Sequence, residues 1–525
     1  MISANGIKAF IIGMMILIFS GGYFGAWAET PLLKVESSPS VAAVAPETPV
    51  TIMVLVTIEA PLLPARTIRP PVAVSLVIDR SGSMDEAKKL DYARKAGKTL
   101  VRALEPRDRF GLVIYDDKVQ ELYPLAPVTD KELIIKLIDG ITPGGFTFLS
   151  GGLEAGIKQA RRPGNAGEVR RVVLLSDGLA NRGITNPELV AAIGAKARNA
   201  GIGVSAIGLG VDYDETLMQL LAQRGGGQYY YIKDSEDLPA VFRQELSLAA
   251  ESVTRDLNAV YKPSGAVSNV TVFGYSSEEN ETSRKIDMSD MTSGEKRQIM
   301  LRLTLTPEKG VKEQSLGELV LNYTGTADGK AQNILLPIKL AVEADDAARQ
   351  ALNAKAEPTL KTVREEGMLQ EAEAAHVAAM AALEQGKKEE AKKRLADSKA
   401  TLAQASPGNK AIANKMLALE ADERQLDQAT SNMALQKSMV KQSKNSAYQS
   451  AKGSKGGMML QRGDKGFMVE KLQRALAEKG FYNGPVNGIY DVLLEESVRK
   501  FQKSQSIDAD GIAGQTTQNA LGILQ

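Results

Sequence analysis

The sequence predicts a multidomain protein in which an α/β domain, a β-rich domain and an α-helical region follow one another. Its 525 residues exceed what one domain holds, because single hydrophobic cores stop growing at roughly 250–300 residues. Between residues 72 and 248, apolar strand-like runs alternate with segments of helical periodicity, which is typical of a doubly wound, Rossmann-like parallel sheet. Further along, the composition changes to short β-like runs and then to an Ala-, Glu- and Lys-rich stretch that favours helix.

The composition excludes several kinds of functional site. The formal net charge is only +1, so the protein lacks the basic field that attracts nucleic acid. The absence of cysteine excludes disulfides, thiolate zinc sites and thiol nucleophiles. The single histidine, His376, lies among alanines and glutamates, and we expect it at a solvated helix position. We therefore expect neither an enzyme active site nor a nucleic-acid partner.

Residues 1–28 have the features of a secretory signal peptide. Lys8 precedes an apolar run over residues 9–19, and a small-x-small pattern ends at Ala28. We expect cleavage after Ala28 and a secreted protein located in the periplasm or cell wall. The alternative is an uncleaved anchor over residues 9–27, the one case in which a membrane contact is expected.

Residues 29–71 are rich in proline and serine and are expected to be a linker that holds one strand, at residues 50–58. This strand has no partner in its own segment. The α/β unit separates it from the short β-like runs of residues 249–343, which predict an antiparallel β-sandwich. We therefore expect the strand to pair with the sandwich.

The α/β domain is predicted over residues 72–248, where strand and helix patterns alternate. Strands are expected at residues 72–78, 110–115, 172–175 and 203–209. Helices are expected at residues 90–104, 131–138, 153–161 and 187–200. Strands that are spaced by helices form βαβ units, which build a doubly wound sheet.

The first strand of this domain ends in a group of oxygen ligands. The apolar run over residues 72–78 leads into Asp79, and Ser81 and Ser83 follow at the second and fourth positions. Open α/β sheets place their sites just beyond the carboxyl ends of such strands. One carboxylate and two hydroxyls at that place form a ligand set suited to a hard cation such as Mg²⁺ or Mn²⁺.

Two further stretches extend this ligand set. Thr147 lies in a glycine-rich loop just before a predicted helix, and Asp177 follows the apolar strand at residues 172–175. Two carboxylates gathered at one edge of a sheet repel each other unless a cation lies between them. Arg80 has an unusual sign for a position beside a cation, so we expect its side chain to point outward.

This pattern resembles the metal-ion-dependent adhesion site of the von Willebrand factor A domain, and the resemblance covers residues 72–248. The matching positions are Asp79, Ser81 and Ser83 of the D-x-S-x-S motif, the loop threonine Thr147 and the final acid Asp177. The resemblance implies a bound Mg²⁺ or Mn²⁺ ion with an open position that an acidic residue of a protein partner fills. The alternative is a cation that only neutralises the two acids.

Residues 344–429 are expected to form an antiparallel helical bundle or hairpin stack that serves as a spacer or a protein contact. Breaks are expected at Pro358, at residues 384–386 and at residues 406–408. Residues 430–460 carry five lysines and no acid, and they are expected to be a flexible basic linker. Attraction of this linker to anionic wall polymers or lipid headgroups is the alternative to simple solvation.

Residues 461–525 contain two similar turns, Asn487-Gly488 and Asp510-Gly511, each of which leads into a helix. The segment resembles the type 1 peptidoglycan-binding domain, a small three-helix fold. The resemblance is carried by L-Q-R-A-L at 472–476, V-R-K-F-Q at 498–502 and D-G-I-A-G-Q-T-T at 510–517, whereas Asp491 and Leu494 replace the usual Gly and Thr. It implies binding of peptidoglycan; the alternative is a structural or protein-docking role.

Together these features predict a non-enzymatic protein of the bacterial cell envelope that binds a protein partner through a cation site while it is anchored to peptidoglycan. The alternative is an accessory or docking subunit of a cell-wall enzyme or of an ATPase chaperone system. A peptidoglycan hydrolase is disfavoured by the single histidine, the absence of cysteine and the lack of paired carboxylates in the last domain.

Overall fold

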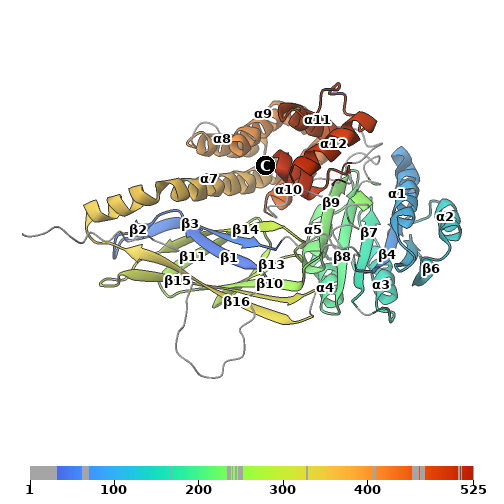
Figure 1. Cartoon of the computed structure of the whole chain (residues 1–525), viewed down its shortest axis with the longest axis horizontal. Helices are drawn as coiled ribbons and strands as arrows, with labels where there is room; N and C mark the ends of the chain where they lie inside the picture. The colour runs from blue at the N-terminus through green and yellow to red at the C-terminus, as the bar shows by residue number, and fades with distance from the viewer. Residues whose placement is uncertain are drawn as a thin grey trace, which may run out of the picture. The chain divides into compact units, whose positions relative to one another are not determined.

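The computed structural model describes residues 32–61, 70–165, 167–232, 252–326, 329–405, 409–451, 467–505 and 511–523, and the single positions 238, 241, 242, 245, 460 and 509. Over these residues the chain forms three β-sheets and a series of helices (Figure 1). The signal peptide expected at residues 1–28 lies outside the described residues.

The α/β domain contains the predicted doubly wound sheet, with strand order β6-β5-β4-β7-β8-β9. Strands β5, β4, β7, β8 and β9 pair in parallel, and β6 pairs with β5 antiparallel. The strands are β4 (Val72–Asp79), β5 (Arg109–Tyr115), β6 (Val119–Pro127), β7 (Val169–Ser176), β8 (Ile202–Leu209) and β9 (Gly226–Ile232). The helices are α1 (Lys89–Ala103), α2 (Lys131–Asp139), α3 (Leu149–Ala160), α4 (Pro187–Arg198) and α5 (Glu215–Arg224), and a 3₁₀ segment, η1 (Gly82–Lys88), precedes α1.

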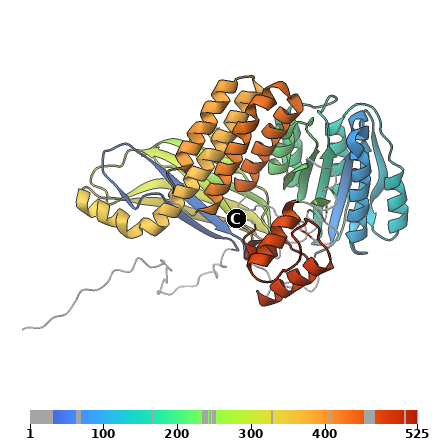
Figure 2. The same ribbon diagram turned by 90° about the horizontal axis from the view of Figure 1, so that it is seen from above.

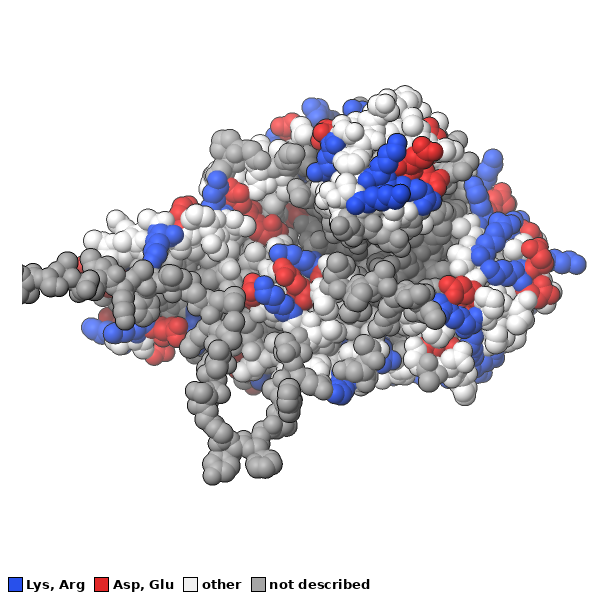
Figure 3. Space-filling view, in the orientation of Figure 1, with Lys and Arg blue, Asp and Glu red and all other residues white. Residues whose placement is uncertain are grey.

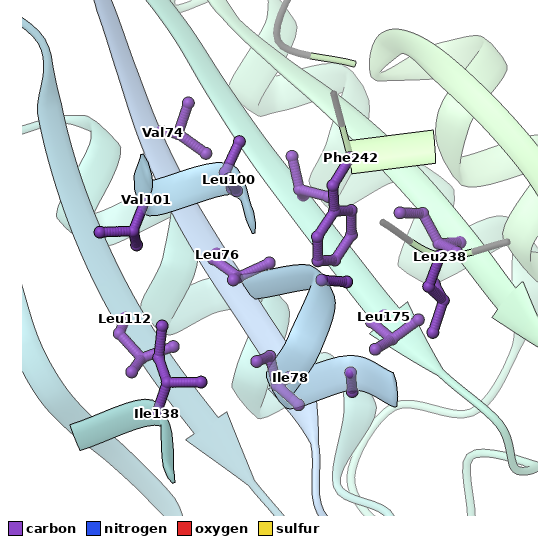
Figure 4. Close-up of a cluster of buried hydrophobic side chains, with 14 of the residues drawn as sticks. Val74, Leu76, Ile78, Leu100, Val101, Leu112, Ile138, Leu175, Leu238 and Phe242 are labelled. Atoms are coloured by element: carbon purple, nitrogen blue, oxygen red, sulfur yellow. The ribbon is translucent and has the colours of Figure 1, made fainter. Parts of the chain in front are cut away.

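Helices cover both faces of this sheet, which explains the unbroken apolar run of β4. All eight residues of β4 are buried, as expected of a central parallel strand. On one face, Leu76 and Ile78 lie in a cluster with Leu100 of α1 and Ile138 of α2 (Figure 4). On the other face, Val77 packs in a second cluster with residues of α3, α4 and α5. The polar residues at the ends of the strands are therefore held by a rigid frame.

Two further sheets form a β-sandwich with orders β1-β3-β14-β11 and β12-β13-β10-β15-β16-β2. Their strands are β1 (Lys34–Pro39), β2 (Ala43–Val44), β3 (Val50–Glu59), β10 (Thr254–Pro263), β11 (Val267–Phe273), β12 (Ser277–Asn280), β13 (Ser283–Asp287), β14 (Lys296–Leu305), β15 (Glu313–Gly325) and β16 (Ala331–Val342). The expected pairing of the N-terminal strand is present, because β3 pairs with β14 from Val50↔Leu305 to Glu59↔Lys296. Alternate residues of β3, such as Val54 and Val56, enter the shared core.

The prediction of a linker over residues 29–71 is wrong for the residues that form β1 and β2. Strand β1 pairs antiparallel with β3, and β2 pairs in parallel with β16. Both lie at the edges of their sheets, and an edge strand tolerates serine and proline because one side of its backbone needs no ladder partner. Their composition therefore resembles that of a linker.

The inserted α/β domain is fastened to the sandwich by Arg198 at the end of α4. Its Nη1 donates to Met288 O (2.7 Å), and its Nη2 lies 3.2 Å from Asp290 Oδ1. Arg224, at the end of α5, adds an ion pair between its Nε and Asp287 Oδ2 (3.4 Å). These contacts join the two domains along the ends of α4 and α5.

Helix α7 (Asp346–Glu384) runs through Pro358, so the break predicted there is wrong. A proline inside a helix removes one backbone hydrogen bond, but contacts with the sandwich hold α7 on both sides of it. Before the proline, Asn353 Oδ1 accepts a hydrogen bond from Ala42 N (2.7 Å). After it, Val363 packs in a cluster with Leu55 of β3. The sequence alone does not reveal this support.

The helical region continues with α8 (Lys388–Leu402), α9 (Lys410–Ser431) and α10 (Met433–Ala451). Figure 2 shows α7 to α10 side by side, and residues of all four helices share one apolar cluster. The break predicted at residues 384–386 coincides with the end of α7, where Gly386 has φ 75°. The break predicted at residues 406–408 lies outside the described residues.

The flexible linker expected over residues 430–460 is wrong for the part that forms α10. Its apolar side chains Met439 and Val440 are buried in the bundle. Lys441 Nζ lies 2.7 Å from Glu215 Oε2 of α5 and 4.0 Å from the centroid of the Tyr213 ring. Lys444 pairs with the same carboxylate. Lys441 and Lys444, two of the lysines that suggested a solvated linker, therefore dock α10 on the α/β domain.

Replacing Glu215 by Gln is expected to lower the free energy of unfolding by about 1–3 kcal/mol at pH 7, because buried Lys441 would lose its charged acceptor. Burial opposes ionisation, but the ion pairs with Lys441 and Lys444 hold the pKa of Glu215 at about 2, below its ordinary value of 4.5. The stabilisation is therefore complete above pH 4.5 and is lost as the pH falls toward the folded-state pKa.

Denaturant titrations of the wild type and Glu215→Gln should accordingly converge as the pH is lowered from 7 to 3. Glu154→Gln, at an exposed acid of α3, is the control and should match the wild type throughout. A deficit of Glu215→Gln that stays constant over this range would contradict the ion-pair origin of the contact.

His376 is buried, so the expectation of a solvated histidine is wrong. Its Nε2 lies 2.7 Å from Asp422 Oδ2, and its Nδ1 lies 2.8 Å from Lys415 Nζ. Because an ammonium group can only donate, Nδ1 accepts from Lys415 and Nε2–H donates to Asp422. Lys415 also donates to Glu373 Oε2 (2.6 Å). The histidine thus belongs to a buried polar cluster that ties α7 to α9.

Over its described residues, the last domain has the expected three helices, α11 (Phe467–Glu478), α12 (Val492–Ser504) and α13 (Gln515–Leu521). A buried glutamine from the preceding helix holds each of its two turns. Gln473 Oε1 accepts from Gly488 N (2.9 Å), and Gln502 Oε1 accepts from Gly511 N (2.9 Å). Asp491, one of the departures from the family pattern, caps α12 by accepting from Leu494 N (2.9 Å). The departure therefore strengthens a helix start.

The surface carries charges of both signs. On the face shown in Figure 3, lysine and arginine side chains are interspersed with acidic ones, in keeping with the near-zero net charge. Among the helices of the described ranges, none is both long and apolar enough to cross a membrane.

Candidate metal centre

Two parallel strands bring the two predicted acids to one edge of the α/β sheet. Strands β4 and β7 are neighbours with Ile78 opposite Leu175, so the residues that follow them, Asp79 and Asp177, leave the sheet at the same edge. Both side chains are fully buried. Burial of two carboxylates in one place is costly unless a positive charge compensates them.

Asp79 is held by neutral donors. Its Oδ1 accepts from Ser81 N (2.8 Å), and its Oδ2 accepts from Ser176 Oγ (2.7 Å) and Tyr115 OH (3.4 Å). Burial raises the pKa of Asp79 to about 6, and the charge of Asp177 adds to the rise while the serine hydrogen bonds oppose it. A cation at this site would favour the ionised carboxylate.

The hydroxyls of the D-x-S-x-S motif lie against Asp177. Ser83 Oγ donates to Asp177 Oδ1 (2.8 Å) and lies 3.3 Å from Ser81 Oγ. The other carboxylate oxygen, Oδ2, accepts from Lys89 Nζ (2.6 Å). Lys89 thus balances part of the charge that the two acids bring.

The loop that carries Thr147 is tied to both acid-bearing loops. Gly82 N donates to Gly145 O (3.0 Å), and Thr147 N donates to Asn181 Oδ1 (2.9 Å). A Cβ atom at Gly178 would lie 3.4 Å from Thr147 Oγ1 and 3.5 Å from Ser83 Oγ. The threonine and serine hydroxyls therefore face the same small space, which the glycine leaves open.

The structure brings all five predicted side chains to this edge of the sheet. Their donor atoms are carboxylate and hydroxyl oxygens only, the chemistry that Mg²⁺ and Mn²⁺ prefer. Among the described residues, no group of three or more His, Cys, Asp or Glu side chains is placed to hold a metal. A cation here would thus depend on the hydroxyls as much as on the acids, and the residues present fit that need.

Three polar neighbours of the site were not predicted from the sequence. Ser176 directly precedes Asp177. Its hydroxyl at the end of an apolar strand marks it in the sequence as a candidate site residue. Asp116 is buried just after β5. Like Asp79 and Asp177, it is an acid at the end of an apolar strand, and the sequence shows this. Lys89 has no such signal in the sequence; it follows two residues in the left-handed conformation, Ala87 and Lys88 (φ 50° and 57°).

Arg80 is turned away from the two acids of the site, as expected, but it is paired with a third acid rather than solvated. Its Nη2 lies 2.7 Å from Asp116 Oδ2, and its Nη1 donates to Thr142 O (3.3 Å). The carboxylate of Asp116 draws the guanidinium into an ion pair beside the threonine loop. This pairing keeps the arginine charge away from the two acids of the site.

Comparison with known proteins gives relatives for different parts of the chain. YfbK, an uncharacterised protein of Escherichia coli, is 28% identical over 239 residues, which are 44% of this chain and 42% of that protein. The chain thus spans less than half the length of that relative. A spore cortex-lytic enzyme of Oceanobacillus iheyensis is 38% identical over 63 residues, 12% of this chain and 23% of the enzyme.

A solved structure shares the fold over a longer span. The von Willebrand factor type A protein from Catenulispora acidiphila superposes with a TM-score of 0.57 at 16% identity, covering 76% of this chain and 91% of its own. The family model of the von Willebrand factor type A domain matches residues 74–244, and that of the peptidoglycan binding domain matches residues 466–521. The chain therefore carries a von Willebrand factor type A domain and a peptidoglycan-binding domain.

Proposed function

We propose that this protein is a non-enzymatic component of the bacterial cell envelope that binds a protein partner through a divalent cation, while residues 461–525 hold peptidoglycan. The proposed ligands of the cation are Asp79, Ser81, Ser83, Thr147 and Asp177. The observation that carries the proposal is the burial of two carboxylates at the ends of adjacent parallel strands with three hydroxyls around them.

Coordination chemistry supports a partner that supplies an acid. Mg²⁺ takes about six oxygens at roughly 2.1 Å and readily retains water. Three hydroxyls and two carboxylates leave a position for one more ligand. A carboxylate of another protein would be attracted by the ion itself. The site would then act as a cation-dependent contact rather than as a catalyst.

The peptidoglycan-binding domain supports a location in the cell wall or envelope. A peptidoglycan-binding domain needs access to the wall, which agrees with the signal peptide proposed at residues 1–28. In this arrangement the last domain holds the wall and the α/β domain recruits a partner. The same contact would serve an accessory subunit of a cell-wall enzyme, and the identity of the partner separates that role from adhesion.

The full chain, incubated with purified cell walls and an envelope extract, is expected to sediment with the walls in both Mg²⁺ and EDTA. Cross-linking should join it to a partner protein in Mg²⁺ only, and mass spectrometry would identify that partner. No soluble wall fragments should appear. Failure to sediment would contradict the anchoring role, and the same cross-links in EDTA would contradict the cation-dependent contact.

A further inference from the structure

Two large apolar side chains stand exposed at the rim of the metal site. Phe146, which precedes Thr147, is 56% exposed, and Leu179, two residues after Asp177, is 59% exposed. A single exposed apolar residue needs no explanation. Here, however, each of the two residues lies within two positions of a proposed ligand. Any partner that reached the cation would therefore contact them.

The loops that carry these side chains are fixed to each other. Asn181 N donates to Thr147 O (3.2 Å), while Asn181 Oδ1 accepts from Thr147 N (2.9 Å). Arg182 places its guanidinium carbon 4.7 Å from the centroid of the Phe146 ring. A cation–π contact with Arg182 thus holds the ring in place while much of its surface stays exposed to solvent. Phe146 and Leu179 form what we call the apolar rim.

Charges of both signs surround the site. Arg182 stands beside the apolar rim, and Asp117 lies against Gly145 of the same loop. Asp85, Glu86 and Lys88 of η1 are exposed next to Ser83 and carry a net negative charge. An acidic partner segment would be attracted toward Arg182 and repelled from η1. It would therefore approach over Phe146 and Leu179.

We propose that the apolar rim selects the partner: it binds a protein loop in which the carboxylate that reaches the cation lies within two residues of a large apolar side chain. This inference rests on the proposed function of the metal site. A carboxylate alone cannot distinguish one protein from another, since all proteins expose acids. An apolar neighbour that is buried against Phe146 and Leu179 adds the missing selectivity.

A library of disulfide-constrained peptides with one fixed aspartate and random flanking positions tests the proposal. The library is displayed on phage, bound to the full chain in Mg²⁺ and eluted with EDTA. Phe, Leu, Ile, Met or Trp should be enriched within two positions of the aspartate. The selected peptides should bind Phe146→Ser/Leu179→Ser at least about 10-fold more weakly, while the Mg²⁺ affinity of that variant stays unchanged.

Leu133→Ser is the matched control, because Leu133 is also an exposed leucine of this domain (47%). It lies on α2, just after Val128, whose N–H bonds to Asp108 O at the start of β5, and so near the edge of the sheet away from the site. This variant should retain full peptide binding.

The outcomes separate this inference from the proposal on which it rests. EDTA-eluted peptides without apolar enrichment would overturn the role of the rim and leave the cation-dependent contact intact. Recovery of no EDTA-eluted peptides would remove both. Mg²⁺-dependent dimerisation that Phe146→Ser/Leu179→Ser abolishes would show that a second copy of the chain covers the rim, which would also overturn the inference.

Discussion

Replacing Asp79 by alanine is expected to abolish Mg²⁺ binding and every contact that depends on the cation. The variant would keep three hydroxyls and Asp177, whose Oδ2 is already paired with Lys89 Nζ at 2.6 Å. The site would lose one of the two charged ligands that attract Mg²⁺. Removing a residue that only hydrogen-bonds to a metal ligand usually weakens metal binding by about 10–100-fold. We expect the Mg²⁺ affinity of Asp79→Ala, measured by isothermal titration calorimetry, to fall by more than this.

Ser176→Ala is the matched control for this variant. It removes the hydrogen bond to Asp79 Oδ2 (2.7 Å) from a residue outside the proposed ligand set, and it should weaken Mg²⁺ by about 10–100-fold. Thermal unfolding gives an independent readout, since a ligand of the folded state raises the unfolding temperature. Mg²⁺ should stabilise the wild type and leave Asp79→Ala unchanged. Equal Mg²⁺ affinities of the wild type and Asp79→Ala would refute the site.

Arg297→Leu is expected to lower the free energy of unfolding by about 3–5 kcal/mol, the usual cost of removing one partner of a buried ion pair. Arg297, on β14, has no exposed surface. Its Nε lies 2.6 Å from Glu295 Oε1, and its Nη2 donates to Asp290 O (2.6 Å). The substitution would leave the buried carboxylate of Glu295 without this cation.

Arg302→Leu provides the comparison, because it changes the same residue type on the same strand. Arg302 is 42% exposed and pairs with Glu371 of α7 at 3.1 Å, so its loss should cost only about 0–1 kcal/mol. Denaturant titration monitored by circular dichroism measures both variants. Similar costs for the two substitutions would contradict the role assigned to burial.

The sequence predicts those features that depend on residues close together along the chain. The doubly wound sheet follows from alternating apolar strands and helices, and the D-x-S-x-S motif supplies three site residues within five positions. Asp177 and Thr147 are predictable because each lies at the end of a strand or in a loop before a helix. Because parallel strands have their carboxyl ends at the same edge of the sheet, parallel pairing predicts that such residues lie close together.

Features that depend on distant partners were missed. Lys441 reads as a solvated lysine until Glu215, 226 positions earlier, is brought beside it. His376 is surrounded by alanine in sequence, but Lys415 and Asp422 bury it in the fold. A charged residue without a nearby partner in sequence predicts a solvated position, whereas in the fold a distant partner of opposite charge can bury it.

The docking of α10 also determines how the protein would carry a mechanical load. In sequence, α10 is the described helix before residues 467–523, and Lys441 and Lys444 fasten it to Glu215. If wall and partner are held together, tension passes through this junction directly into the α/β domain. An ion pair resists stretching over a few ångströms, so the connection between α10 and the α/β domain is short and stiff while α10 is docked. Once the junction yields, the load falls on α7 to α9 and the sandwich, and the tether becomes longer and more extensible.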